Sequence, residues 1–333
     1  MVATTAVRLL LALLIIIDVE ASASSSSWQQ WSCDELTPNL CDLHVTSGSL
    51  TIKSIPVKYW RYTRASPSSS SGNSSSDDEI SHSIIAVHGG PGFPHSYLLP
   101  LKQLACRDDI AAEVIFYDQA GCGESIPLAD SKTTKTAKKE SREEFSVTTD
   151  HHPHLLDPTY YSEIELPALI DHWKLQRYHI LGHSWGTILA QLFAFYYANM
   201  NTAYSTEEDE EAGHRYQQQQ QTPSSLQSLI LAGPVSDAKS YIAAQWTANE
   251  TNDDDNGNNN NLASLPPFIQ KRLHSLEEQR AYDTPEYEAI DEVLTTFFTM
   301  RTAPPPDCFT ESANGTNKDI YVGMQGASEF TIG

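Results

Sequence analysis

The stretch Gly182-His183-Ser184-Trp185-Gly186 decides the fold of this 333-residue chain. An apolar strand is predicted immediately before it at residues 178–181, and residues 187–193 continue with a pattern typical of a helix. A strand that turns directly into a helix through Gly-x-Ser-x-Gly forms a nucleophile elbow, because the glycines leave room for the crossing. The serine side chain is then held in a strained turn above the sheet. The spacing therefore predicts that Ser184 is a catalytic nucleophile.

The groups that a nucleophilic serine needs can be assigned in part. Its hydroxyl requires a histidine to take the proton, a carboxylate to orient that histidine, and N–H donors for the oxyanion. The backbone N–H of Trp185, the residue after the nucleophile, is expected to be one donor. The second is expected from the loop HGGPG at 88–92, whose glycines allow close approach to a carbonyl oxygen. We favour Gly90 as this second donor.

The predicted secondary structure alternates between strands and helices and then becomes helical. Strands are expected at 83–87, 114–117, 178–181 and 228–232, after one or two antiparallel strands at 50–62. Helices are expected at 160–173, where Pro167 must start or kink the helix, from 185 towards 200, and after 265. This order indicates an α/β fold, with a doubly wound sheet covered by a helical cap.

Four motifs follow one another in an order that is more specific than any one of them. They are HGGPG at 88–92, DQAGCGES at 118–125, GHSWG at 182–186 and MQGASEF at 324–330. This series resembles the proline iminopeptidase family of α/β-hydrolases over about residues 84–333. The resemblance implies a serine aminopeptidase that releases an N-terminal residue, often proline, from a peptide or amino-acid amide through an acyl-enzyme. It also implies that Glu329 binds the free ammonium group of the substrate, since a desolvated ammonium requires a paired charge.

The resemblance divides the chain into a core and a cap. Residues 24–235 correspond to the α/β-hydrolase core, with low-complexity insertions near 66–79 and 205–222. Residues 236–333 correspond to the helical cap. This cap is expected to be incomplete, and the last strands of the sheet are expected to be missing.

The base that should assist Ser184 is not found in the sequence. The family order places the acid and then the histidine after the serine, where only His214 and His274 occur. The first lies in a polar insertion and the second on a predicted helix surface, so neither follows a strand. Asp237 follows a strand, but it is expected at the start of the first cap helix. We therefore expect the catalytic Asp and His to lie beyond residue 333, and this chain to be nearly inactive.

The histidines near the elbow and in the loops are expected to be structural. His183 directly precedes the nucleophile, so its side chain should point away from the hydroxyl. His88 should brace the oxyanion loop. The patch of His151, His152 and His154 is expected to be a surface loop rather than a metal site.

Residues 1–23 have the composition of a secretory signal peptide. Arg8 precedes nine consecutive apolar residues at 9–17, and residues 21–23 (Ala-Ser-Ala) offer a cleavage site. Nine residues are too few to span a bilayer, although an N-terminal membrane anchor is the alternative interpretation. Three sequons agree with a secretory route, at Asn73, Asn249 and Asn314. We expect an extracellular or lumenal protein.

The charge and the cysteines limit the partners and the cofactors. A formal charge of −22 disfavours nucleic acid and anionic lipid as partners, and no later segment is long enough to cross a membrane. Cys33 and Cys41 are close enough in sequence to close a small disulfide loop. The total of five cysteines is odd, so at least one thiol is left without a partner in this chain, and Cys122 is expected to be small and buried. Because no Cys-x-x-Cys pair occurs, neither zinc nor another cofactor is expected.

Two other functions fit the same motifs. An esterase or amino-acid amidase would use the same elbow, and comparing proline amides with simple esters as substrates would distinguish it. A non-catalytic α/β-hydrolase relative used for binding would explain the missing base, and the reactivity of Ser184 towards a fluorophosphonate would distinguish it. An epoxide hydrolase or dehalogenase is disfavoured, because those relatives carry Asp at the elbow.

Overall fold

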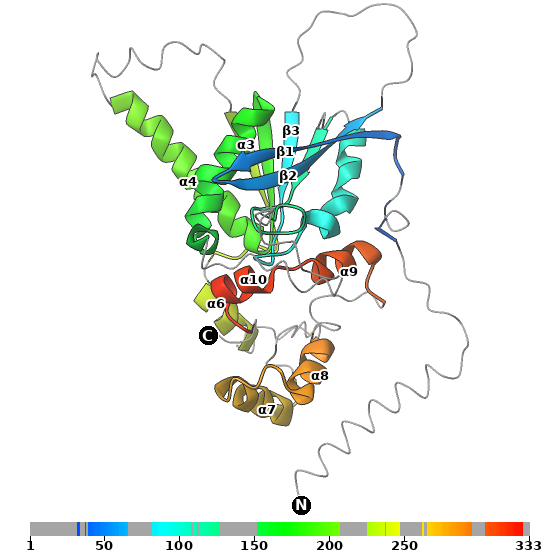
Figure 1. The fold of residues 1–333 in the computed structure, drawn as a ribbon, viewed down its shortest axis with the longest axis vertical. Coiled ribbons are helices and arrows are strands. Elements are labelled where there is room, and N and C mark those ends of the chain that lie inside the picture. The colour runs from blue at the N-terminus through cyan, green and yellow to red at the C-terminus, as the bar shows by residue number, and fades with distance from the viewer. Residues whose placement is uncertain are drawn as a thin grey trace, which may run out of the picture.

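A six-stranded mixed β-sheet forms the centre of the computed structural model (Figure 1). The structure describes residues 32–33, 37, 39–65, 82–107, 109–111, 113–126, 152–206, 225–236, 238–246, 262, 265–294 and 304–328. The strands lie in the order β1-β2-β4-β3-β5-β6. Their bounds are β1 Leu43–Ile52, β2 Ile55–Arg64, β3 His82–Val87, β4 Glu113–Tyr117, β5 Arg177–His183 and β6 Ser225–Ala232. The β1–β2 and β2–β4 pairs are antiparallel, and the β4–β3, β3–β5 and β5–β6 pairs are parallel.

The strands confirm the predicted pattern with two corrections. The first antiparallel pair begins earlier than predicted, at Leu43, and turns at Lys53 and Ser54, both with positive φ (44° and 70°) as a two-residue hairpin requires. The strand predicted to be buried at 228–232 is part of β6, but it is half exposed, with Ile230 at 41%. Among the described residues β6 pairs with β5 along one edge only, which leaves its other edge and part of both faces uncovered.

Helices connect and flank the strands. They are the 3-10 helices η1 His95–Cys106 and η2 Pro153–Leu156, the π-helix η3 Tyr160–Glu165, and the α-helices α3 Leu166–Trp173, α4 Trp185–Thr206, α6 Ala238–Trp246, α7 Pro267–Glu278, α8 Pro285–Leu294, α9 Asp307–Asn314 and α10 Lys318–Gln325. Pro167 lies in the first turn of α3, directly after η3, so the expected break in the 160–173 helix is confirmed.

The two faces of the sheet bury separate clusters of apolar side chains. Ile85 and Val87 of β3 lie in one cluster with residues of α3 and α4, whereas Ile84 and Ala86 lie in the other with Leu98 of η1. Because β3 is covered on both faces, its sequence is a continuous apolar run rather than an alternation. A sheet whose central strand is covered by helices on both faces is the arrangement expected of a doubly wound fold.

The C-terminal helices fall into two groups. Helices α7 and α8 share a cluster of their own, built from Leu273, Leu276, Tyr287, Ile290 and Leu294 with Leu262. Phe268 of α7 and Val293 of α8 lie outside this cluster and are 59% and 42% exposed. Ile320 of α10 instead belongs to the main core cluster.

Two disulfides replace the predicted Cys33–Cys41 loop. Cys33 is bonded to Cys308 at the start of α9, and Cys41 is bonded to Cys106 at the end of η1, with Cα–Cα distances of 5.8 and 5.6 Å. The expected pairing is wrong because the two segments diverge, one towards α9 and the other towards η1. Cys122 is free and buried, as expected.

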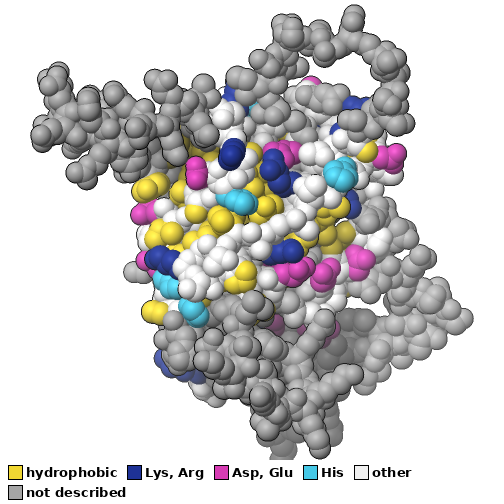
Figure 2. All heavy atoms as spheres, turned by 45° about the horizontal axis from the view of Figure 1, so that its top comes forward, with side chains coloured by type: hydrophobic (Ala, Val, Ile, Leu, Met, Phe, Trp, Pro, Cys, Tyr) yellow, Lys and Arg dark blue, Asp and Glu magenta, His cyan; other side chains and the backbone are white. Residues whose placement is uncertain are grey.

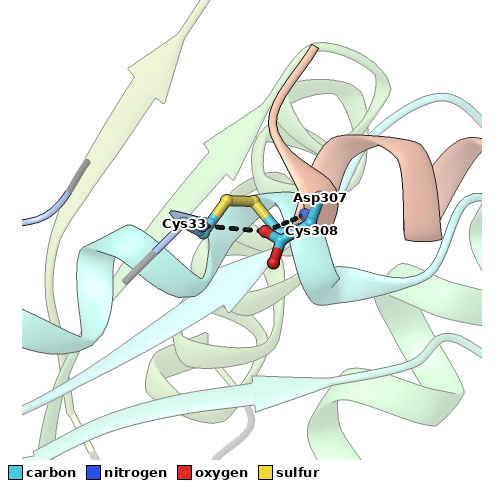
Figure 3. A group of neighbouring side chains, drawn as sticks. All are labelled: Cys33, Asp307 and Cys308. Carbon is cyan, nitrogen blue, oxygen red and sulfur yellow. Dashed lines mark hydrogen bonds between the residues drawn. A yellow bond between two sulfur atoms is a disulfide. The ribbon is translucent and has the colours of Figure 1, made fainter. Parts of the chain in front are cut away.

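Asp307 lies beside the first disulfide and brings three possible metal-ligating side chains together, as Figure 3 shows. Its Oδ1 accepts the backbone N–H groups of Cys33 (2.8 Å) and Cys308 (2.6 Å). A cysteine binds a metal as the thiolate, and here both sulfurs are joined to each other. The group therefore fastens the N-terminal segment to α9 and is not a metal site in this oxidation state.

The face of the molecule in Figure 2 carries no single chemical character. On the face in Figure 2, apolar side chains lie between basic and acidic ones, so the negative charge of the chain is not gathered there. Within the described ranges no helix combines the length and the hydrophobicity that a membrane crossing needs. The proposed signal peptide lies outside these ranges.

A buried glutamate lies under the loop that follows β4. Glu165, at the end of η3, is fully buried, and its Oε2 accepts the N–H of Ala120 (2.9 Å). Its other oxygen has no hydrogen-bond partner among the described residues. Burial raises the pKa of Glu165 to about 8, so the side chain is uncharged at neutral pH.

This raised pKa predicts a pH-dependent stability. The folded chain keeps the Glu165 proton that the unfolded chain releases near pH 4.5, so the stability contributed by this group falls as the pH rises from 4.5 to about 8. The slope is at most about 1.4 kcal/mol per pH unit. In urea denaturation across this range, Glu165→Gln should remove the slope, whereas Glu163→Gln, at an exposed position of the same helix, should keep it. Equal slopes in wild type and Glu165→Gln would contradict the buried neutral acid.

Gly186, at the start of α4, lies so close to the backbone at the end of β3 that an added methyl group should destabilise the fold. A Cβ on Gly186 would overlap the carbonyl oxygen of Val87 and lie 2.6 Å from that of His88. We expect Gly186→Ala to lower the free energy of unfolding by about 3 kcal/mol or more, as overpacking against rigid backbone does. Gly233→Ala is the matched control, because Gly233 has a φ of +58° but nothing described within 4 Å. It should cost only backbone strain of about 1 kcal/mol, and equal losses in urea denaturation would count against this account.

Candidate active site

Ser184 occupies the sharp turn between β5 and α4. Its φ is 51°, which is a strained value for a residue with a Cβ and is typical of a nucleophile elbow. The turn is held on both sides, since the N–H of Ser184 donates to the carbonyl of Ala232 (2.9 Å) and the Ser184 carbonyl accepts from Thr187. Both the backbone N–H (2.9 Å) and the hydroxyl (2.6 Å) of Thr187 donate to it. The side chain of Ser184 remains half-buried at the surface of the turn.

The glycine loop after β3 lies directly against this elbow. A Cβ on Gly89 would be 2.8 Å from the Cβ of Ser184 and 3.2 Å from the backbone nitrogen of Trp185. Gly90 follows with a φ of +57°, a conformation that favours glycine. Within the described ranges no protein acceptor binds the N–H of Gly90 or Trp185, whereas the N–H of Gly89 is occupied. The structure thus brings the loop that carries Gly90 against Ser184 and Trp185, and the roles of Gly90 and Trp185 as oxyanion donors stay a prediction.

Tyr97 links the glycine loop to the elbow, and the sequence analysis missed it. Its hydroxyl accepts the N–H of Gly89 (2.7 Å) and lies 2.9 Å from Nδ1 of His183. Burial lowers the pKa of His183, which keeps this ring neutral. Nδ1 of a neutral ring either accepts the Tyr97 proton or donates to the Tyr97 oxygen, depending on the tautomer. The side chain of His183 is thus bonded to Tyr97, and no hydrogen bond joins it to the Ser184 hydroxyl in the described part of the chain.

His88 fixes the base of the glycine loop from inside the protein. It is fully buried, its Nε2 accepts the N–H of Gln119 (2.9 Å), and its carbonyl accepts the side-chain amide of Gln119 (2.8 Å). Burial lowers the pKa of His88 to about 4, with Asp118 opposing the shift, so the ring is neutral. The expected bracing role is confirmed by these bonds.

Asp118 organises the second glycine loop, residues 118–125. It accepts the N–H groups of His95 and Glu124 and lies 2.8 Å from Nδ1 of His95. Burial acts to raise the pKa of Asp118, but the hydrogen bond and charge of His95, with His88 and the Glu124 N–H, hold it below its ordinary value. His95 stacks on Trp60 of β2, with ring centroids 4.1 Å apart. This Asp–His pair therefore shapes the loop, and no contact joins it to Ser184 in the described part of the chain.

Helices α9 and α10 fasten onto both glycine loops, across the end of the sheet where the elbow lies (Figure 1). Asn317, which caps α10, donates its backbone N–H to Gly92 (2.9 Å) and its side-chain amide to Gly121 (2.8 Å). Ser312 of α9 accepts the N–H of Tyr97 (3.0 Å). These contacts join residues that are distant in sequence, and no local pattern marks them.

The remaining predicted partners are either outside the described residues or away from Ser184. Glu329, Asp237 and His214 lie outside the described residues. His274 is an exposed residue of α7, as expected. Where the chain is described, no hydrogen bond joins a histidine to the hydroxyl of Ser184.

Comparisons with known proteins agree with this architecture. Residues 83–281 match the model of the alpha/beta hydrolase fold family. The proline iminopeptidase of Heyndrickxia coagulans is 29% identical over 250 residues, which cover 75% of this chain and 64% of that protein. The proline iminopeptidase of Lactobacillus helveticus (strain DPC 4571) is 26% identical over 249 residues, covering 74% and 64%. The chain thus spans less than two thirds of the length of these curated relatives.

Solved structures share the fold. A crystal structure of proline iminopeptidase from Mycobacterium smegmatis superposes with a TM-score of 0.56 at 22% identity, covering 86% of this chain and 73% of that one. The crystal structure of VinJ superposes with a TM-score of 0.53 over the same shares. The predicted fold and the predicted resemblance are confirmed, and the chain belongs to the α/β-hydrolase fold family.

Proposed function

We propose that this chain carries the nucleophile and the oxyanion donors of a serine hydrolase that releases an N-terminal residue, often proline, from a peptide or amino-acid amide. The observation that supports the proposal is the contact between Gly89, in the loop of residues 88–92, and the strained turn of Ser184. The backbone N–H groups of Gly90 and Trp185 have no protein acceptor among the described residues, so both are available to an oxyanion. The curated relatives named proline iminopeptidase support the choice of substrate.

The chemistry assigned to this arrangement is acyl transfer. The Oγ of Ser184 attacks the carbonyl carbon of the first peptide bond, and the carbonyl oxygen becomes an oxyanion that Gly90 and Trp185 stabilise by donating N–H groups. The C–N bond then breaks, the proton from Oγ leaves with the amine, and water later hydrolyses the ester. A base has to carry that proton, and the described residues do not provide one near Ser184.

Recognition of the substrate's free ammonium is assigned to Glu329. Ser328, the residue before it, is buried and donates its hydroxyl to Glu277 of α7 (2.5 Å). Glu277 also accepts from Tyr287 of α8 (2.7 Å), so the segment that leads to Glu329 is tied to the α7–α8 pair. A carboxylate carried by this segment would pair with an ammonium that has lost its water.

A non-catalytic binding protein is the second candidate. The absence of a histidine beside the Ser184 hydroxyl among the described residues favours it. An esterase or amidase would share the elbow and differ only in the substrate.

The nucleophile is tested with a fluorophosphonate probe and with Pro-p-nitroanilide. The hydroxyl of Ser184 should displace fluoride from the probe and become labelled, because the elbow exposes it beside two N–H donors. Ser184→Ala should abolish labelling, whereas Ser275→Ala, a serine of α7, should retain it. Mass spectrometry of the labelled peptide identifies the site.

The two readouts separate the candidates. Labelling at Ser184 supports a hydrolase site, and labelling without turnover is the result expected for a chain that is nearly inactive. Turnover of Pro-p-nitroanilide would support the exopeptidase and contradict the expected inactivity, and turnover of simple esters alone would support an esterase. Neither labelling nor turnover, in a protein that is folded by circular dichroism, would support the binding protein instead.

Tyr97→Phe tests how the glycine loop is positioned. Loss of the hydroxyl leaves the N–H of Gly89 and Nδ1 of His183 without their partner, so Gly90 is held less firmly beside the oxyanion. We expect the labelling rate of Ser184 to fall by about tenfold or more, since one oxyanion donor is worth about 100-fold or more. Tyr59→Phe is the matched control, because its hydroxyl also lies 2.9 Å from a histidine, His172, away from the elbow. An equal effect of both changes would show a general loss of stability rather than of positioning.

A further inference from the structure

Two histidines lie side by side on neighbouring parallel strands of the sheet, away from the elbow. His82 is the first residue of β3, and His179 lies on β5, five residues before Ser184. Both belong to the amino-terminal part of their strands, whereas Ser184 follows the carboxyl end of β5. Both side chains are half-buried, so solvent reaches them. The function proposed for Ser184 uses neither ring.

The two rings share a proton. Nδ1 of His82 lies 3.1 Å from Nε2 of His179, and Nδ1 of His179 lies 2.8 Å from the hydroxyl of Ser228 on β6. The serine hydroxyl can donate or accept, so either tautomer of His179 is possible. In both cases one proton lies between the two ring nitrogens, and the lone pair of one nitrogen faces the other ring.

The surroundings of His179 favour its uncharged form. Burial lowers the pKa of His179, and His82 and Arg177 add to this effect. Arg177 is on the same strand, and its guanidinium donates to Gln227 of β6 (3.1 Å). A neutral imidazole is the form that binds a metal ion.

The separation of the two nitrogens suits a single metal ion. Imidazole nitrogens bind zinc at about 2.0–2.1 Å, so two of them on one tetrahedral ion lie about 3.3 Å apart. The observed distance of 3.1 Å between Nδ1 of His82 and Nε2 of His179 is close to this value, so a small movement of the rings would suffice. Ser228 supplies what metal-binding histidines usually have, a polar partner on the second ring nitrogen, and its hydroxyl can accept from Nδ1–H of His179 when Nε2 binds the ion.

We propose that His82 and His179 form a binding site for a divalent transition-metal ion, with Ser228 orienting His179. The ion replaces the proton between the rings, and this proton moves to the other nitrogen of the ring that carries it, Nε2 of His82 or Nδ1 of His179, so each ring keeps one N–H. Water completes the coordination on the exposed side. Affinity for such a nitrogen site should rise from Zn²⁺ and Ni²⁺ to Cu²⁺. The bound ion joins β3 to β5 directly and, through Ser228, to β6.

The proposal is tested on the untagged, chelator-treated protein by calorimetric titration with Cu²⁺, Ni²⁺ and Zn²⁺. We expect one site that His82→Ala and His179→Ala each weaken at least tenfold. Ser228→Ala should weaken it by about tenfold, as loss of a partner to a ligating histidine does. The control is the double change of His152 and His154 to Ala, two histidines that also neighbour each other, with ring centroids 5.7 Å apart. This control should bind as wild type does.

Two further readouts identify the ligands. The electron paramagnetic resonance spectrum of the Cu²⁺ complex should show two nitrogen ligands in wild type and one in His82→Ala. The melting temperature of wild type should rise with the metal, and that of His82→Ala should not. Because His82 begins its strand and is half-buried, His82→Ala should fold even if His179→Ala does not. Binding that is unchanged in His82→Ala, or lost in the His152 and His154 control, would overturn the site.

Discussion

The close approach of three backbone segments is the constraint on which the rest of the structure depends. The turn after β5, the start of α4 and the loop after β3 meet at Gly182, Gly186 and Gly89, where no side chain fits. This contact forces Ser184 into a left-handed conformation and sets the glycine loop beside it. The backbone contact determines where the loops lie, and the hydrogen bonds of Tyr97, His88 and Asn317 hold them there.

The sequence predicts those parts of the fold that are determined locally. The strand–turn–helix around Ser184 and the two glycine loops follow from short patterns, and the buried strands follow from apolar runs. The contacts that could not be predicted join distant residues: Tyr97 to His183 across 86 positions, and Asn317 to Gly121 across 196. The predicted pairing of Cys33 with Cys41 is wrong for the same reason, because proximity in sequence says little about where two diverging segments end. The exposure of β6 depends on which strand pairs with its free edge, and the residues of β6 do not encode this.

Neutral side chains surround the elbow although the chain as a whole is strongly acidic. His88, His183 and Glu165 are all held uncharged at neutral pH by burial. Asp118 is a buried group of this region whose pKa is held below its ordinary value, and hydrogen bonds from His95 and from the Glu124 N–H satisfy its carboxylate. It therefore does not draw on the N–H groups of Gly90 and Trp185.

The bond between Cys33 and Cys308 closes a loop of 275 positions and makes α9 a covalent strap over the end of the sheet. Such a strap cannot swing aside as a lid does, because Ser312 also ties α9 to Tyr97 of η1, and Asn317 ties the start of α10 to both glycine loops. A ligand that reaches Ser184 must therefore pass this fixed side of the site, whereas α7 and α8 share a separate small core.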